Sequence, residues 1–223
     1  MKKKMRLIVG GVIGCVILLG ANELEITKQS CNNGESVACT KLGFIYQTGE
    51  GVLKNEIKAV QLFDKSCTLN NGFGCANLGI YYKEGSQSVS KDEFKAVELF
   101  KKGCNLNDGL ACSNLGIMYQ TGRGISKDEI KASELYRQGC ELNDGTGCTG
   151  LGFLYYQGKG VIKDESKAIQ LYKQGCDLDN GFGCMILGAT YMEGQGVPKN
   201  VSKAVKFFNK ACSLGFKQAC GFI

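Results

Sequence analysis

Residues 104–139 read CNLNDGLACSNLGIMYQTGRGISKDEIKASELYRQG, and this stretch decides the fold because the rest of the chain repeats its pattern. Two cysteines eight residues apart, Cys104 and Cys112, mark its beginning. Such pairs recur at intervals of 36 or 37 residues: Cys31–Cys39, Cys67–Cys75, Cys104–Cys112, Cys140–Cys148, Cys176–Cys184 and Cys212–Cys220. A period of this length is typical of a solenoid, whose repeats bury their apolar faces by stacking on one another. One elongated array is therefore expected.

The cysteine pairs predict disulfides. A turn dipeptide lies within each of the five complete repeats' pairs, for example Asn71-Gly72 and Asp108-Gly109. In an unbroken helix the paired cysteines would lie about 12 Å apart, beyond the roughly 4.4–6.8 Å between Cα atoms that a disulfide needs. With a turn between them they can meet, so we predict six local bridges. Zinc explains the pattern less well, because structural zinc sites favour closer cysteines and the chain has no histidine.

Each repeat contains two stretches of helical periodicity, here called helix A and helix B. Helix A reads Cys-x-x-Leu-Gly-x-x-Tyr and is expected to end three residues after the tyrosine, at Gly49, Gly85, Gly122, Gly158 and Gly194. Helix B carries Lys-Ala and is expected to begin after an N-capping residue: Asn55, Asp92, Asp128, Asp164 and Asn200. We predict one solenoid domain over 22–223, with a capping helix at 22–33, five full repeats at 34–213 and a truncated helix at 214–223.

The first residues predict export. Three lysines and an arginine among residues 1–6 precede an apolar run over 7–20, which is short for a spanning helix and typical of a signal peptide. We predict a signal peptide at 1–21 and a secreted or periplasmic protein, which agrees with thirteen cysteines in one chain. Two alternatives stay open. The run over 7–20 could remain as a membrane anchor, or Cys15 could carry a lipid, although the apolar residues after Cys15 do not suit a lipoprotein site.

The charge argues against nucleic acid as a partner. The formal net charge is +6, and removal of the four basic residues of the predicted signal peptide leaves 23 basic and 21 acidic residues, a net charge of +2. The remaining lysines are scattered over helix surfaces and form no basic block. An electrostatic footprint for nucleic acid is therefore missing from the sequence.

The combined pattern Cys-x-x-Leu-Gly-x-x-Tyr-x-x-Gly-x-Gly-Val-x-Lys-Asp-x-x-Lys-Ala resembles the Sel1-like repeat, a relative of the tetratricopeptide repeat. With its Cys-x7-Cys pairs, the chain is similar to the Helicobacter cysteine-rich protein family over essentially everything after the predicted signal peptide. The resemblance implies an all-α fold, a right-handed α/α superhelix (solenoid) with one disulfide per repeat. It also implies an exported bacterial protein, and members of that family are classed as weak penicillin-binding proteins or β-lactamases.

A binding surface is expected on the concave face, which the A helices line in solenoids of this type. Asn77 and Asn114 occupy positions at which tetratricopeptide domains place asparagines that bind a ligand backbone. The predicted ligand-binding residues are Asn77, Asn114, Phe73, Ile80, Lys83, Ser113, Ile117, Gln120, Thr149, Phe153 and Tyr156, and the stripe continues through Phe182 and Met185. They suit an extended peptide, a muropeptide, or an exported or host protein. Alternatively, the large apolar members pack between repeats, or the array is a structural spacer.

Hydrolysis of β-lactams is the alternative function that the resemblance suggests. Because histidine is missing, every Ser-His or Cys-His scheme is excluded. The chain has one Ser-x-x-Lys segment, from Ser88 to Lys91, in the only A–B loop with an extra residue, and neither Ser-Asp-Asn nor Lys-Thr-Gly accompanies it. Ser88 and Lys91 are therefore weak candidates, and any turnover is expected to be slow. We predict no cofactor and no metal.

Overall fold

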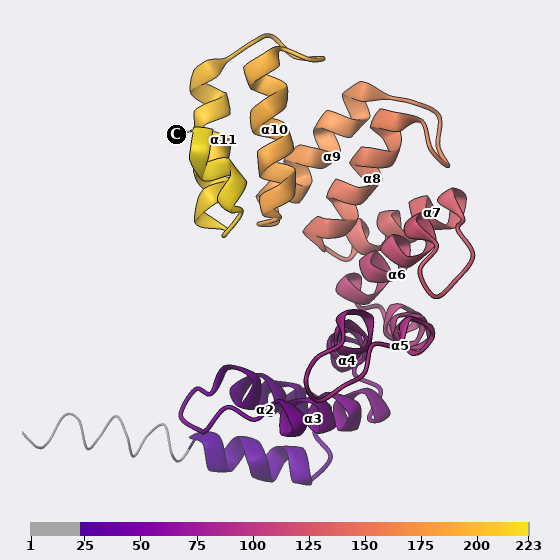
Figure 1. The fold of residues 1–223 in the computed structure, drawn as a ribbon, viewed down its shortest axis with the longest axis vertical. Helices are drawn as coiled ribbons and strands as arrows, with labels where there is room; N and C mark the ends of the chain where they lie inside the picture. The colour runs from indigo at the N-terminus through magenta and orange to yellow at the C-terminus, as the bar shows by residue number, and fades with distance from the viewer. Residues whose placement is uncertain (1–22, 223) are drawn as a thin grey trace, which may run out of the picture.

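The computed structural model describes residues 23–222, which form helices joined by short turns and loops (Figure 1). A helix over residues 23–32 comes first. It is followed by α2 (Ser36–Thr48), α3 (Glu56–Thr68), α4 (Gly72–Glu84), α5 (Glu93–Asn105), α6 (Gly109–Thr121), α7 (Glu129–Glu141), α8 (Gly145–Gln157), α9 (Glu165–Asp177), α10 (Gly181–Glu193), α11 (Val201–Ser213) and the 3-10 helix η1 (Lys217–Phe222). The even-numbered helices are the A helices, and the odd-numbered helices from α3 to α11 are the B helices. The predicted all-helical array of helix pairs is confirmed.

The ends of the helices lie where the sequence places them. Every A helix ends at the expected glycine, which has a positive φ. Every B helix begins after the expected asparagine or aspartate, whose side chain accepts a hydrogen bond from the backbone N–H three residues further on. This bond satisfies one of the N–H groups that a helix start leaves without a partner. The A–B loop is therefore fixed at both of its ends.

A repeated lysine–tyrosine contact also holds the A–B loop. In the second repeat, Lys95 Nζ lies 4.2 Å from the centroid of the Tyr82 ring, and the backbone N–H of Asp92 donates to the Tyr82 carbonyl at 2.8 Å. The equivalent lysine lies over the equivalent tyrosine ring in all five repeats. A cation over an aromatic face is attractive. The contact explains why lysine precedes alanine in each B helix.

All six predicted disulfides are confirmed. The bridged Cα atoms lie 4.5 to 5.0 Å apart, and each bridge joins a cysteine near the end of one helix to a cysteine in the helix that follows. The turn differs from the expectation in one detail. Asn70, one residue before the Asn71-Gly72 dipeptide, has the left-handed conformation (φ 60°), while Asn71 caps α4 by accepting from Gly74 N–H. Asparagine tolerates this conformation better than most residues.

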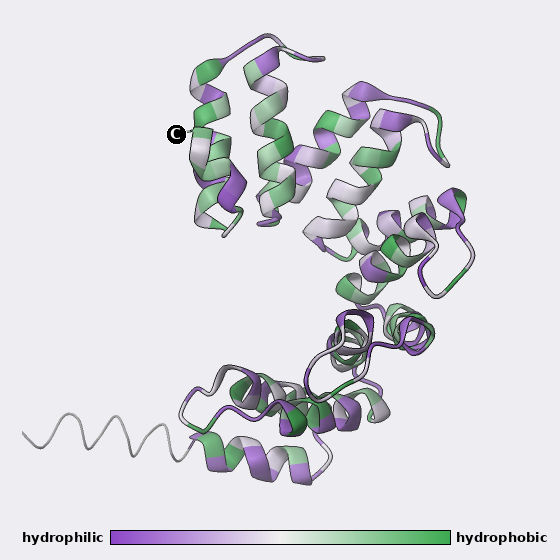
Figure 2. Ribbon diagram, in the orientation of Figure 1, coloured by the Kyte–Doolittle hydropathy of each residue, from purple (hydrophilic) through white to green (hydrophobic). Residues whose placement is uncertain are grey.

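The core is a series of aromatic side chains spread along the array. Each B helix places one buried ring against the A helix of its own repeat, at Phe63, Phe100, Tyr136, Tyr172 and Phe208. The glycine of the Leu-Gly pair makes room for the ring: a Cβ atom on Gly79 would lie 2.6 Å from Phe100 Cε1. Hydrophobic residues accordingly occur on every helix in Figure 2. The glycine therefore allows the close helix approach expected from the sequence.

The helix pairs stack into a curved array (Figure 1). Each helix packs mainly on its neighbours in the chain, and consecutive A helices also contact one another directly, whereas consecutive B helices do so far less. The closer spacing of the A helices places them on the inner side of the curve. Side chains that point away from the B helices on α4, α6, α8 and α10 therefore converge on one concave surface.

The two ends of the chain differ from the repeats between them. The predicted signal peptide at 1–21, the alternative anchor at 7–20 and the alternative lipid site at Cys15 lie outside the described residues. Within residues 23–222, no helix is long and apolar enough to cross a membrane. At the other end, η1 packs on α11, and its Phe222 ring stacks on Phe208 at a centroid distance of 4.7 Å.

Candidate functional site

Two adjoining hollows form a groove on the A-helix surface. One, of about 550 Å³, lies between α8 and α10, and the other, of about 300 Å³, lies between α6 and α8. Phe153 of α8 and Phe182 of α10 line both hollows. We call their combined surface the A-helix groove. It extends over α6, α8 and α10, the A helices of three repeats.

Helical spacing brings the groove residues to one side of each A helix. On α8, Thr149, Phe153 and Tyr156 are separated by four and three residues, which places them along one face. On α10, Phe182 and Met185 have the equivalent spacing. The B helices supply the back of the groove through the buried rings of the third and fourth repeats, Tyr136 and Tyr172.

The hollow between α6 and α8 has a neutral polar lining. The Tyr136 hydroxyl donates to Gln120 Oε1 at 2.6 Å, and Thr149 Oγ1 donates to Asn180 Oδ1 at 3.1 Å. Burial raises the pKa of Tyr136 well above the usual tyrosine value, so its hydroxyl stays a hydrogen-bond donor even in alkaline solution. Ile117 and Phe153 add apolar surface. This half of the groove can hold an apolar or neutral polar side chain.

The hollow between α8 and α10 combines aromatic walls with carboxylates. Its rings are Phe153, Tyr156, Tyr172 and Phe182, and its two charged residues are Glu165 and Glu193. Tyr156 and Phe182 are 43% and 42% exposed, so both rings are available to a ligand. Burial raises the pKa of Tyr172 far above its usual value.

The structure brings together five of the predicted ligand-binding residues. Ile117, Gln120, Thr149, Phe153 and Tyr156 all line the A-helix groove. Thr149 does so with little exposed surface, and its hydroxyl donates to Asn180 Oδ1. These five positions therefore line a defined cavity, while their role in binding a ligand remains a prediction.

The other predicted residues lie outside the groove. Phe73 is exposed and packs beside Phe44 at a centroid distance of 5.6 Å, and Ile80 packs against the core around Phe100. The Asn77 amide donates to the Phe73 carbonyl within its own helix at 2.7 Å.

Three further predicted residues are engaged or buried within the protein: Lys83, Asn114 and Ser113. Lys83 Nζ donates to Asn114 Oδ1 at 2.9 Å, and Asn114 Nδ2 donates to the Leu110 carbonyl at 2.9 Å. Asn114 is only 5% exposed. Ser113 is fully buried. A ligand would have to replace the lysine to reach the Asn114 oxygen.

Sequence reasoning missed the contribution of the B helices to the groove. Ile169 and Tyr172 of α9, together with Glu165 at its start, line the larger hollow. The period-36 pattern marks Tyr172 as a core residue, and nothing local in the sequence indicates that its edge reaches a surface cavity. The A-helix stripe through Phe182 and Met185, by contrast, follows from the repeat register alone.

The Ser88 segment lies at a different place, in the loop between α4 and α5. The Ser88 backbone N–H donates to Glu56 Oε1 at 3.3 Å. Lys91 Nζ pairs with Glu93 Oε1 at 2.8 Å, and Arg123 Nε binds the same oxygen at 2.8 Å. These two cations lower the pKa of Glu93. Within residues 23–222, Lys91 makes no hydrogen bond with Ser88, so the pair lacks the contact that a nucleophile and its base require.

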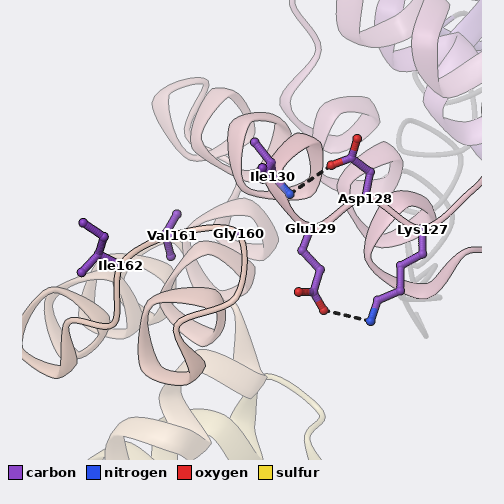
Figure 3. A pocket seen from close by; sticks show the side chains of 7 residues that line it. All are labelled: Lys127, Asp128, Glu129, Ile130, Gly160, Val161 and Ile162. Atoms are coloured by element: carbon purple, nitrogen blue, oxygen red, sulfur yellow. Dashed lines mark hydrogen bonds and ion pairs between the residues drawn. The ribbon is translucent and has the colours of Figure 1, made fainter.

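Figure 3 shows a third hollow, between the start of α7 and the loop before α9. Its charged groups already have partners. Lys127 Nζ pairs with Glu129 Oε1 at 2.8 Å, and Asp128 Oδ1 caps α7 by accepting from Ile130 N–H at 3.1 Å. Gly160 packs so closely on the Glu129 backbone that a side chain would not fit. We interpret this hollow as the seam between two repeats.

Metal binding has no visible basis in the part of the chain that the structure describes. No three His, Cys, Asp or Glu side chains gather there closely enough to hold an ion. All twelve described cysteines are disulfide-bonded and offer no thiolate. The A-helix groove is the candidate site for another molecule, because it combines a hollow shape with aromatic surface and hydrogen-bonding groups.

The chain belongs to the Sel1 repeat family. The Sel1 repeat model matches five segments, at residues 36–71, 72–108, 109–144, 146–180 and 182–216. A Sel1 repeat protein from Oxalobacter formigenes is 27% identical, with a TM-score of 0.73 over 88% of this chain and 86% of that one. The structure of c5321, a protective antigen present in uropathogenic Escherichia coli strains, is 29% identical, with a TM-score of 0.70 over 86% of this chain and 41% of that one.

Sequence identity also confirms the resemblance to the cysteine-rich Helicobacter proteins. Helicobacter pylori cysteine rich protein B is 37% identical over 61% of this chain and 98% of that one, with a TM-score of 0.48. This chain carries one disulfide per repeat. Among curated proteins, none matches the chain significantly.

Six disulfides indicate an oxidising compartment outside the cytoplasm.

Proposed function

We propose that the A-helix groove binds an extended peptide, as a segment of an exported or host protein or as the peptide of a muropeptide. The observation that carries the proposal is that the two hollows adjoin: Phe153 and Phe182 line both, and together the hollows extend over α6, α8 and α10. Sel1 repeats generally mediate protein binding, which supports this class of ligand.

The lining of the groove suits a peptide better than a polymer of one charge. Aromatic rings such as Tyr156 and Phe182 offer large, rigid contact surfaces, and such side chains often dominate the energy of protein interfaces. Gln120 offers its amide nitrogen within the same surface, while its oxygen accepts from Tyr136. An extended chain could place its side chains in the hollows and a backbone carbonyl against this amide.

The test is the loss of peptide binding when Phe153 is replaced by alanine. Ligands would first be selected from a displayed library of random heptapeptides and from a muropeptide digest, with the oxidised protein as bait. Phe153→Ala is expected to weaken binding at least tenfold, about 1.4 kcal/mol, because Phe153 lines both hollows. Phe94→Ala is the matched control, since Phe94 is 75% exposed and lines neither hollow. Equal affinities for the wild type and Phe153→Ala would contradict the proposal.

We also propose that the protein is exported into the periplasm or secreted after cleavage of the segment 1–21. The disulfides and the basic–apolar pattern of the first residues support this location. Mass spectrometry of the protein from periplasm and medium should find an N-terminus at Asn22. An N-terminus at Met1, or a lipid on Cys15, would support one of the anchored alternatives.

A further inference from the structure

The hollow between α8 and α10 has an unbalanced charge. Glu165 and Glu193 are its only charged lining residues, and neither lysine nor arginine lines it. The described residues as a whole are nearly balanced, with 23 basic and 21 acidic side chains. The rest of the lining is neutral, being apolar and aromatic apart from Thr190 and Gln195. The local excess of carboxylate therefore favours a cationic group on the ligand.

Of the two carboxylates that line the hollow between α8 and α10, one has no ion-pair partner among the described residues and can pair with a ligand. Glu165 Oε1 pairs with Lys163 Nζ at 2.8 Å. Glu193 is exposed at the end of α10 and makes no ion pair within residues 23–222. A cation that enters the hollow would thus meet Glu193 without displacing an existing partner.

The aromatic walls favour a cation that can also lie flat on a ring. Phe153, Tyr156 and Phe182 line the hollow together. Lys163 Nζ already lies 5.9 Å from the centroid of the Tyr156 ring, so the molecule itself places a cation near this ring. An arginine guanidinium is planar and weakly hydrated, and it stacks on aromatic faces while pairing with a carboxylate. A lysine ammonium is more strongly hydrated and would lose more on entering.

We infer that the hollow between α8 and α10 takes an arginine side chain of the bound peptide, held between the aromatic walls and Glu193. This inference rests on the proposed peptide-binding function and names the ligand's chemistry at one position. The neighbouring hollow, with Ile117 and Gln120 in its lining, takes an apolar or neutral side chain. Packed helices lie about 8–10 Å apart and an extended chain rises roughly 3.3 Å per residue, so the two side chains should be two or three positions apart.

A selected peptide and its citrulline analogue provide the test. Citrulline keeps the shape of arginine and removes its charge. Peptides selected by the oxidised wild-type protein should be enriched in arginine, and citrulline at that position should weaken binding about tenfold. In Glu193→Gln the same exchange should cost less than threefold. Glu134→Gln is the matched control, since Glu134 is exposed on α7 and lines neither hollow, and it should keep the tenfold effect.

The outcomes separate the two proposals. Peptides that depend on Phe153 but show no arginine preference, or bind equally with citrulline, would overturn the arginine inference and leave the proposed function standing. A tenfold citrulline effect that persists in Glu193→Gln would also overturn it. A library that yields no peptide dependent on Phe153 would overturn the proposed function and the inference together.

Discussion

Replacing Ser113 by alanine should stabilise the protein. Ser113 is fully buried, and its Oγ has no hydrogen-bond partner among the described residues. A buried hydroxyl without a partner costs about 1–3 kcal/mol, because it loses its bonds with water and gains none. Alanine removes this cost and adds roughly 0.5 kcal/mol of helix propensity. Ala76 already occupies the equivalent position one repeat earlier and is also fully buried.

A small packing loss opposes this gain. Removing one oxygen leaves a void of roughly 15 Å³, which costs about 0.4 kcal/mol at about 24 cal/mol per Å³. The expected net gain is about 1–3 kcal/mol, or a rise in melting temperature of roughly 2–12 °C for a chain of this size. Thr149→Val is the matched comparison one repeat later. It keeps the shape but removes the bond to Asn180 Oδ1, so it should destabilise by about 1 kcal/mol.

The free energy of unfolding would be measured in urea by circular dichroism, with the disulfides intact. The two variants should shift the midpoint in opposite directions with unchanged slope. If Ser113→Ala lowered stability by as much as Thr149→Val, the Ser113 hydroxyl would have a partner, such as a buried water, and the reasoning would be refuted.

Two further predictions concern pH and redox conditions. Burial raises the pKa of Tyr136 and Tyr172, so the stability that these groups confer is fully present below about pH 10, where unfolded tyrosine ionises, and is lost as the pH rises further. Tyr172→Phe should therefore reduce the loss of unfolding free energy between pH 9 and 11, and an unchanged loss would contradict this. Mild reduction should open Cys212–Cys220 first, because Cys220 is exposed while the cysteines of the other five bridges are buried. Alkylation and peptide mapping would reveal the order, and another bridge opening first would count against exposure as the cause.

The sequence predicts those features that depend on a few neighbouring residues. Each disulfide closes within nine residues, and each cap, such as Asp92 at the start of α5, bonds a backbone group three residues away. These interactions follow from residue type and spacing. The repeat then copies them along the chain, so one correct reading of residues 104–139 extends to the whole array.

The candidate site depends on contacts between repeats, and such contacts are harder to predict from the sequence than contacts within one repeat. Lys83 meets Asn114 across 31 positions in the sequence, and whether it fills the expected ligand position depends on the exact stacking of α4 on α6. Ser113 is buried because glycines on α7 and α8 let those helices approach it. Tyr172 looks like a core residue in the sequence and also borders the groove. Small offsets between neighbouring helices decide whether such a side chain is paired, buried or exposed to the groove.

The locality of the disulfides has a consequence for how the protein is made. In every bridge, a cysteine pairs with the next cysteine in the sequence. A chain that enters an oxidising compartment from its N-terminus therefore presents each pair in the native order, before the following pair arrives. Correct bridges can form one repeat at a time, and little reshuffling by an isomerase is needed. Repeats could thus mature in sequence during synthesis, each on the surface of the one before.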